Sequence, residues 1–84
     1  MYEQSIHCLK SIKRLLGEVS AHLRDVTMLR LYIRADASNE QSQNDISRAL
    51  HDAFGNELPA SSWILVSGLA DPNWLIEIEA QAVI

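Results

Sequence analysis

The sequence predicts a small α+β domain, and three observations support this fold class. Two segments carry apolar residues at the spacing of amphipathic helices. Three other segments alternate, or run apolar, in the manner of β-strands. The order along the chain is helix, strand, helix, strand, strand, and no internal repeat or linker interrupts it. The 84 residues therefore predict a single domain, residues 1–84.

The first helix is expected from about Tyr2 to Leu16, and Gly17 is expected to end it as a C-cap. Its apolar residues recur at helical spacing: Ile6, Leu9, Ile12 and Leu16. Lys10, Lys13 and Arg14 cover the other side, which indicates a solvated basic face. A turn through residues 20–25 follows.

The first strand is expected at residues 26–34, where the side chains alternate. One face carries Leu29, Leu31 and Ile33. The other face carries Met28, Arg30, Tyr32 and Arg34.

A polar loop, residues 35–41, leads into a second helix expected at residues 42–54 and ended by Gly55. Residues 61–67 form an apolar extended segment, and residues 70–74 form a turn. The last strand is expected at residues 75–84. Its polar face carries Glu77, Glu79 and Gln81.

The middle three elements make a βαβ unit, so the first two strands should be parallel with a right-handed crossover. We expect a mixed sheet with two helices on the face of Leu29, Leu31 and Ile33. Simple alternation would place Trp63 and Leu65 on the opposite face, beside Met28 and Tyr32. An uncovered face of that kind is too apolar for water, which predicts a homo-oligomer.

Composition excludes several classes of function. The net charge of −4 and the pI of about 5.1 argue against a nucleic-acid partner, because a surface that binds nucleic acid is basic. The single cysteine, Cys8, allows no intrachain disulfide, and the three histidines show no metal-ligand spacing. We expect no metal and no cofactor. No secretory or membrane-spanning segment is evident, so a cytoplasmic location and no membrane partner are expected.

The segment from Pro59 to Ile84, PASSWILVSGLADPNWLIEIEAQAVI, resembles the C-terminal signature of the RidA/YjgF family of endoribonuclease L-PSP-like, reactive intermediate deaminases. That signature has a Pro-Ala-Arg type start, an apolar strand, a Leu-x-x-Pro turn and a Glu-Ile-Glu-Ala-x-Ala-Val end. The resemblance implies a chorismate-mutase-like (YjgF-like) fold. It also implies a homotrimer whose sheets enclose a barrel, with small-molecule pockets between subunits.

The chain departs from the family pattern in two ways. The family normally begins with a strand hairpin and a further strand before the first helix, and this sequence shows no counterpart. Ser61 stands where deaminating members have an arginine that grips the substrate carboxylate. Serine cannot reproduce a bidentate guanidinium contact, so normal deaminase activity is not expected, and whether the chain is an enzyme stays open.

The resemblance suggests four site residues: Asn44, Ser61, Trp63 and Glu77. Glu77 matches a glutamate that positions a water on an imine, which makes it the candidate catalytic residue. The alternative, which we favour, is a structural charge that pairs across strands with Arg30 or Arg34. Asn44 is either a pocket residue or an ordinary polar residue in the first helical turn. Trp63, like Trp74, is either a pocket aromatic or a packing residue.

Two functions remain open. The first is an oligomeric domain that binds a small imine, enamine or carboxylate metabolite without normal deaminase activity. The alternative is a non-catalytic structural or interaction protein, or a truncated relic of the family. The family order also leaves residues 75–84 as an open sheet edge. We expect pairing along residues 76–83 with another chain, which would give a two-fold dimer or another symmetry in place of the trimer.

Overall fold

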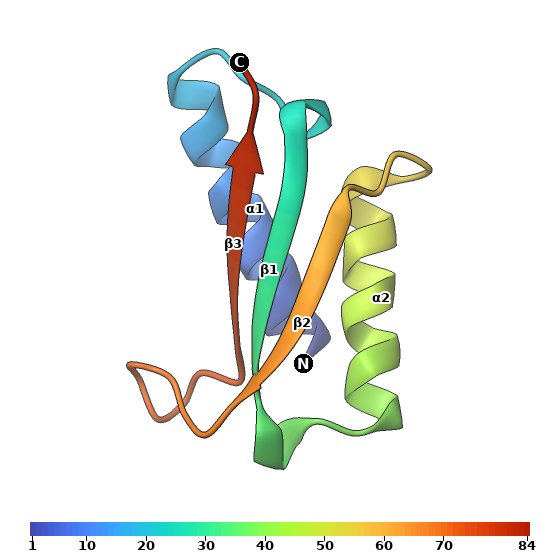
Figure 1. Ribbon diagram of the computed structural model, residues 1–84, viewed down its shortest axis with the longest axis vertical. Coiled ribbons are helices and arrows are strands. Elements are labelled where there is room, and N and C mark those ends of the chain that lie inside the picture. The colour runs from blue at the N-terminus through green and yellow to red at the C-terminus, as the bar shows by residue number, and fades with distance from the viewer.

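Two helices pack on one side of a three-stranded sheet in the computed structural model, which describes residues 1–84 (Figure 1). The elements follow the expected order: α1 (Tyr2–Glu18), β1 (Val26–Arg34), α2 (Glu40–Phe54), β2 (Ala60–Val66) and β3 (Ile76–Ala82). Two short 3₁₀ turns, η1 (Leu23–Asp25) and η2 (Ala35–Ala37), flank β1. The α+β fold class is confirmed.

The sheet order is β2-β1-β3, so β1 is central and both other strands are edges. β1 and β2 are parallel, as the βαβ unit requires, whereas β1 and β3 are antiparallel. In Figure 1, α1 crosses behind β1 and β3, and α2 lies beside β2. The mixed sheet and its open β3 edge agree with the sequence-based prediction.

The core lies between the sheet and the helices. Leu29, Leu31 and Ile33 of β1 are almost completely buried, as their alternation predicted. They pack with the apolar stripes of both helices and with β3, the central residues being Leu9, Ile46, Ala49, Leu50 and Ile76. Burying one such side chain contributes about 1.5–3 kcal/mol, so these contacts fix which side of the sheet the helices cover.

The parallel register corrects the expected position of two β2 side chains. Trp63 is the partner of Leu31 and Leu65 is the partner of Ile33, and laterally paired residues point to the same face. Both side chains therefore lie on the helix side, where they remain 37% and 59% exposed. Ile64, the partner of Tyr32, lies on the open face instead.

The end of α1 also differs from the expectation. The helix continues through Gly17 to Glu18, and Ser20, not glycine, adopts the left-handed conformation with φ of 61°. The Ser20 N–H donates to the Gly17 carbonyl and the Ala21 N–H donates to the Leu16 carbonyl. This is the Schellman pattern, which normally carries glycine at the position of Ser20.

Helix α2 begins two residues earlier than expected because Asn39 caps it. The Asn39 side chain accepts a hydrogen bond from the Ser42 N–H, and the Ser42 hydroxyl accepts one from the Asn39 N–H, each at 2.8 Å. This reciprocal pair is a capping box. At the other end the prediction is confirmed, because Gly55 follows the helix with φ of 62°.

Hydrogen bonds between side chains and distant segments join the elements. The Gln4 side chain in α1 donates to the Asn73 carbonyl at 3.0 Å and accepts from the Leu75 N–H at 2.7 Å. The Tyr2 hydroxyl donates to Asp52 of α2 at 2.7 Å. The first turn of α1 is thus tied both to α2 and to the start of β3. No helix of this structure has the length and apolar character needed to cross a bilayer.

Candidate functional site

The four residues suggested by sequence occupy three separate elements. Ser61 and Trp63 lie on β2, Glu77 lies on β3, and Asn44 is an exposed residue one turn inside α2, not in its first turn. The register puts Ser61 and Trp63 on the helix side of the sheet and Glu77 on the open face, beside Tyr32. One chain brings only Ser61 and Trp63 together, so a site that contains all four requires a second copy.

Ser61 is engaged with its neighbour on the same face. The Trp63 indole N–H donates to the Ser61 hydroxyl oxygen at 3.2 Å. Both residues are exposed, at the outer edge of the sheet. A hydroxyl in this position offers a single neutral contact, so this end of β2 holds no group that could grip a carboxylate through two charged hydrogen bonds.

The expected ion pairs between β3 and β1 do not form. Glu79 faces Arg30 in the register, but its carboxylate accepts a hydrogen bond from the Tyr32 hydroxyl at 2.7 Å. Arg34 pairs instead with Asp36 at 2.6 Å and donates to the Pro72 carbonyl. The bond to Glu79 is the main cause that raises the pKa of Tyr32 above its ordinary value. The Glu77 carboxylate makes no hydrogen bond or ion pair within the chain.

A groove lies along the β3 edge, and we call it the edge groove. Its lining residues come from one side of α1 between Glu3 and Leu15, from residues Ile76–Ile78 of β3, and from Asn73 and Trp74 before that strand. It has a volume of about 580 Å³ and includes Glu77. Burial raises the pKa of the Cys8 thiol in this groove, and the Glu77 charge adds to the shift, so the thiol is protonated and a poor nucleophile at neutral pH.

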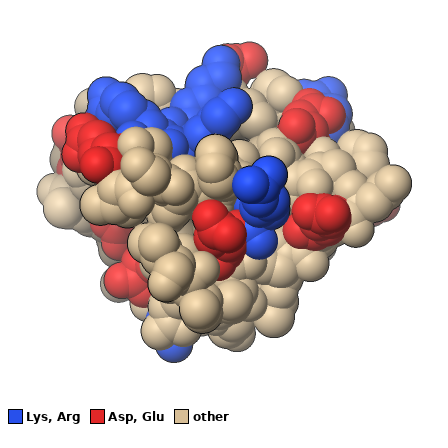
Figure 2. Space-filling view, turned by 90° about the horizontal axis from the view of Figure 1, so that it is seen from above, with Lys and Arg blue, Asp and Glu red and all other residues tan.

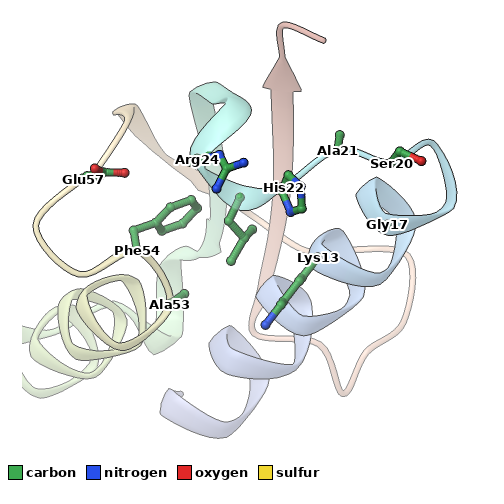
Figure 3. Close-up of a pocket in the computed structure, with 10 residues that line it drawn as sticks. Lys13, Gly17, Ser20, Ala21, His22, Arg24, Ala53, Phe54 and Glu57 are labelled. Atoms are coloured by element: carbon green, nitrogen blue, oxygen red, sulfur yellow. The ribbon is translucent and has the colours of Figure 1, made fainter.

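A second concavity, the basic pocket, lies where the ends of both helices meet η1 (Figure 3). Its volume is about 520 Å³. Lys13 comes from α1, His22 and Arg24 come from the turn after it, and Phe54 and Glu57 come from the end of α2. Figure 3 shows Arg24 and His22 on the turn above Lys13, with the Phe54 ring beside Arg24.

Lys13 and Arg24 of the basic pocket form no ion pair within the chain and do not cap a helix. The one ion pair in the structure is Arg34–Asp36, so Lys13 and Arg24 hold no carboxylate within 4.0 Å. They do not cap α1 either, because backbone N–H groups after the helix bond to its last carbonyls. Figure 2 looks onto this end of the molecule and shows basic side chains gathered on one part of it, with acidic ones around them. The pocket therefore offers two cations without an ion-pair partner beside an aromatic ring, with the Glu57 carboxylate also in its lining.

Sequence reasoning missed the basic pocket because its members lie far apart along the chain. Lys13 belonged to a basic helix face that we interpreted as solvated, and Arg24 lay in a turn without a pattern of its own. The available signal was weak: a basic residue in the turn after a basic helix face. Elsewhere, no three His, Cys, Asp or Glu side chains come close enough together to hold a metal ion.

The sequence matches the family model described as Endoribonuclease L-PSP over residues 1–84. The chain belongs to this family. No curated protein matches it. Solved structures do match, and the chain resembles several of them over nearly its whole length.

Three of these structures each share 30% identity with the chain. A protein of the conserved Rid family from Yersinia pestis matches 100% of this chain and 62% of its own length, with a TM-score of 0.87. A member of the YjgF/YER057c/UK114 family from Mycobacterium tuberculosis matches 95% and 64%, with a TM-score of 0.83. A protein of unknown function from Pseudomonas aeruginosa matches 93% and 54%, with a TM-score of 0.82. The chain thus spans less than two thirds of the length of these relatives.

Proposed function

We propose that this Endoribonuclease L-PSP family chain is an oligomeric domain that binds small carboxylate metabolites and does not deaminate imines at the rates of deaminating members. The observation that carries the proposal is the basic pocket, in which Lys13 and Arg24 hold no intrachain partner beside the Phe54 ring. A carboxylate can accept charge-assisted hydrogen bonds from both cations, while an apolar body rests on the ring.

The absence of deaminase activity rests on different residues. Ser61 stands where the deaminating members have arginine, and its hydroxyl already accepts from Trp63. Glu77 lies on the other face of the sheet, with no cation bound to it. Ser61 and Glu77 could lie in one imine-hydrolysing site only between two copies of the chain. That site would still lack an arginine to bind the substrate carboxylate.

Ligand binding is tested by NMR titration with 3-phenylpropanoate, using its neutral amide as the matched ligand. We expect shifts at the amides of residues 13, 22–24 and 54 for the acid alone. Arg24→Gln and Lys13→Gln should each weaken binding roughly threefold to tenfold, because each removes one exposed charged contact. Arg14→Gln, on the same helix but outside the pocket, is the control. Equal shifts with the amide ligand would contradict the proposal.

Deamination is tested separately by coupling an amino-acid oxidase to the hydrolysis of the imine that it releases. We expect ammonia to form at the rate seen without the protein. Acceleration by the purified chain would contradict this part of the proposal and leave the carboxylate pocket unaffected. If Ser61 does occupy the arginine position of an inter-subunit site, Ser61→Arg should introduce activity.

The second candidate is a non-catalytic interaction protein, and one observation favours it. Large apolar side chains remain exposed at both sheet edges, among them Leu65, Trp74, Val83 and Ile84. The RNA cleavage implied by the family's description is the least favoured, because basic side chains form no stripe along the strands and the net charge is −4.

A further inference from the structure

The basic pocket contains an acidic group as well as its cations. Glu57 follows α2 and lines the pocket together with Lys13 and Arg24. It is exposed and forms no ion pair, so its carboxylate lies more than 4.0 Å from the charged nitrogen atoms of both cations. Figure 3 shows Glu57 and Arg24 on opposite sides of Phe54. Charges of both signs therefore border one concavity without pairing with each other.

The end of α2 adds hydrogen-bond acceptors to the same pocket. The helix ends at Phe54, and the carbonyl groups of Asp52 and Ala53 in its last turn accept no backbone N–H. Ala53 and Phe54 both line the pocket, and Glu57 lies three residues beyond the helix end. Open carbonyl groups at a helix C-terminus carry a partial negative charge and attract cations. This side of the pocket is therefore suited to a positive group.

A ligand whose only charge is a carboxylate matches this charge pattern only in part. Lys13 and Arg24 attract it, but Glu57 and the C-terminal ends of α1 and α2 repel it. Each helix end is equivalent to about half an elementary negative charge, so these groups offset much of the charge of the two cations. A ligand with a positive group next to its carboxylate would turn this repulsion into attraction.

We propose, as a refinement that rests on the proposed function, that the ligand of the basic pocket is an α-amino acid with an aromatic or large apolar side chain, bound as its zwitterion. The carboxylate lies against Lys13 and Arg24, and the α-ammonium lies against Glu57 and the open carbonyl groups of α2. The apolar side chain rests on the Phe54 ring. Each charge of the ligand then has a partner of opposite sign. The pocket volume of about 520 Å³ accommodates one such molecule.

Two ligands that differ only in the ammonium group test this assignment. L-Phenylalanine is 3-phenylpropanoate with an α-ammonium group in place of one hydrogen atom. In an NMR titration at neutral pH, both should shift the amides of residues 22–24 and 54. L-Phenylalanine should bind roughly twofold to fivefold more tightly, which is the range for one exposed ion pair. L-Phenylalaninamide keeps the ammonium group but lacks the carboxylate, so it should bind more weakly than L-phenylalanine.

Glu57→Gln tests the partner of the ammonium group. It should raise the dissociation constant of L-phenylalanine roughly twofold to fivefold, and leave that of 3-phenylpropanoate unchanged or lower. Glu57→Lys should reverse the preference, so that 3-phenylpropanoate binds more tightly than L-phenylalanine. Glu40→Gln is the control for Glu57→Gln, because it changes the net charge equally at the other end of α2 and should leave both constants unchanged. Glu57 is exposed and unpaired, so its variants should keep the circular dichroism of the wild type.

The two levels of the proposal fail in different ways. If 3-phenylpropanoate binds and L-phenylalanine binds no more tightly, the amino-acid ligand is wrong and the carboxylate site still stands. The amino-acid ligand is also wrong if Glu57→Gln weakens the binding of both ligands equally, because the ammonium group would then have no partner in Glu57. If neither ligand shifts the pocket amides, the carboxylate site and the amino-acid ligand are both overturned.

Discussion

Ser20, not Gly17, occupies the position after α1 at which glycine is usually found. Gly17 lies within α1, where a Cβ atom would meet nothing within 4 Å, whereas Ser20 adopts the left-handed conformation that glycine tolerates best. Gly17→Ala should raise the free energy of unfolding by about 1 kcal/mol, the usual difference inside a helix. Ser20→Gly should raise it by up to about 1 kcal/mol through relief of strain.

Urea denaturation measures both changes, and Gly55→Ala is the control. Gly55 has a φ of 62°, so a side chain there is strained and the variant should be destabilised. If Gly17→Ala destabilised the protein instead, α1 would have to end at Gly17.

The Cys8 thiol makes stability depend on pH in the alkaline range. Its pKa is raised above 9.0 in the folded state, chiefly by burial, so the protonated thiol favours folding. This contribution is complete below pH 9.0 and is lost as pH rises through the folded-state pKa. Stability should therefore fall from about pH 9.0 upward in the wild type, before the tyrosines titrate, and Cys8→Ala should flatten that first step. Thermal unfolding from pH 7 to 10 checks the difference.

At the scale of the elements, Gln4 ties α1 to the turn before β3. Its side chain makes two hydrogen bonds to the backbone of Asn73 and Leu75. Gln4→Ala should cost about 1–3 kcal/mol, because two backbone groups lose their partners. Gln43→Ala, an exposed glutamine in α2, should change stability by less than about 0.5 kcal/mol. Equal effects in chemical denaturation would show that the Gln4 bonds contribute little.

The elements were largely predictable from sequence, but the side chains of β2 were not. Alternation in β1 assigned Leu29, Leu31 and Ile33 to the core because polar residues separate them. In β2, residues Trp63 to Val66 are all apolar, so no period identifies the inner face. Only the pairing of Trp63 with Leu31 decides it. The start of α2 differs from the prediction for a similar local reason: the polar sequence around Asn39 predicts a loop, whereas Asn39 caps the helix.

The candidate site was less predictable than the fold. The resemblance located Ser61 and Glu77 on strands, but their placement on opposite faces follows from two registers that span distant parts of the chain. The basic pocket unites Lys13, Arg24 and Phe54 only after both helices pack. Such sites have no spacing rule in the sequence, because tertiary packing creates them.

At the scale of the whole molecule, we propose the open face of the sheet as the surface through which copies of the chain associate. The open face carries Met28, Tyr32, Ile64 and Val66 among charged groups, and Ile64 is 37% exposed. Ile64→Asp should dissociate any contact through this face, because a buried unpaired charge is costly. The product should be the single chain of 9.4 kDa. Leu65→Asp, on the other side of the same strand, should leave the assembly intact. Light scattering distinguishes these outcomes.

The central position of β1 has a consequence for the folding pathway. Its partners in β2 lie 32 positions later in the chain, and those in β3 lie 43 to 56 positions later, so no hairpin can nucleate the sheet. Each pairing must close a long loop before any contact offsets the entropy lost. Refolding should therefore be slow for a chain of 84 residues. Until β2 and β3 pair with β1, both edges of this apolar strand have unpaired backbone groups. The collapsed chain is then vulnerable to aggregation. Stopped-flow refolding at rising protein concentration would detect both effects.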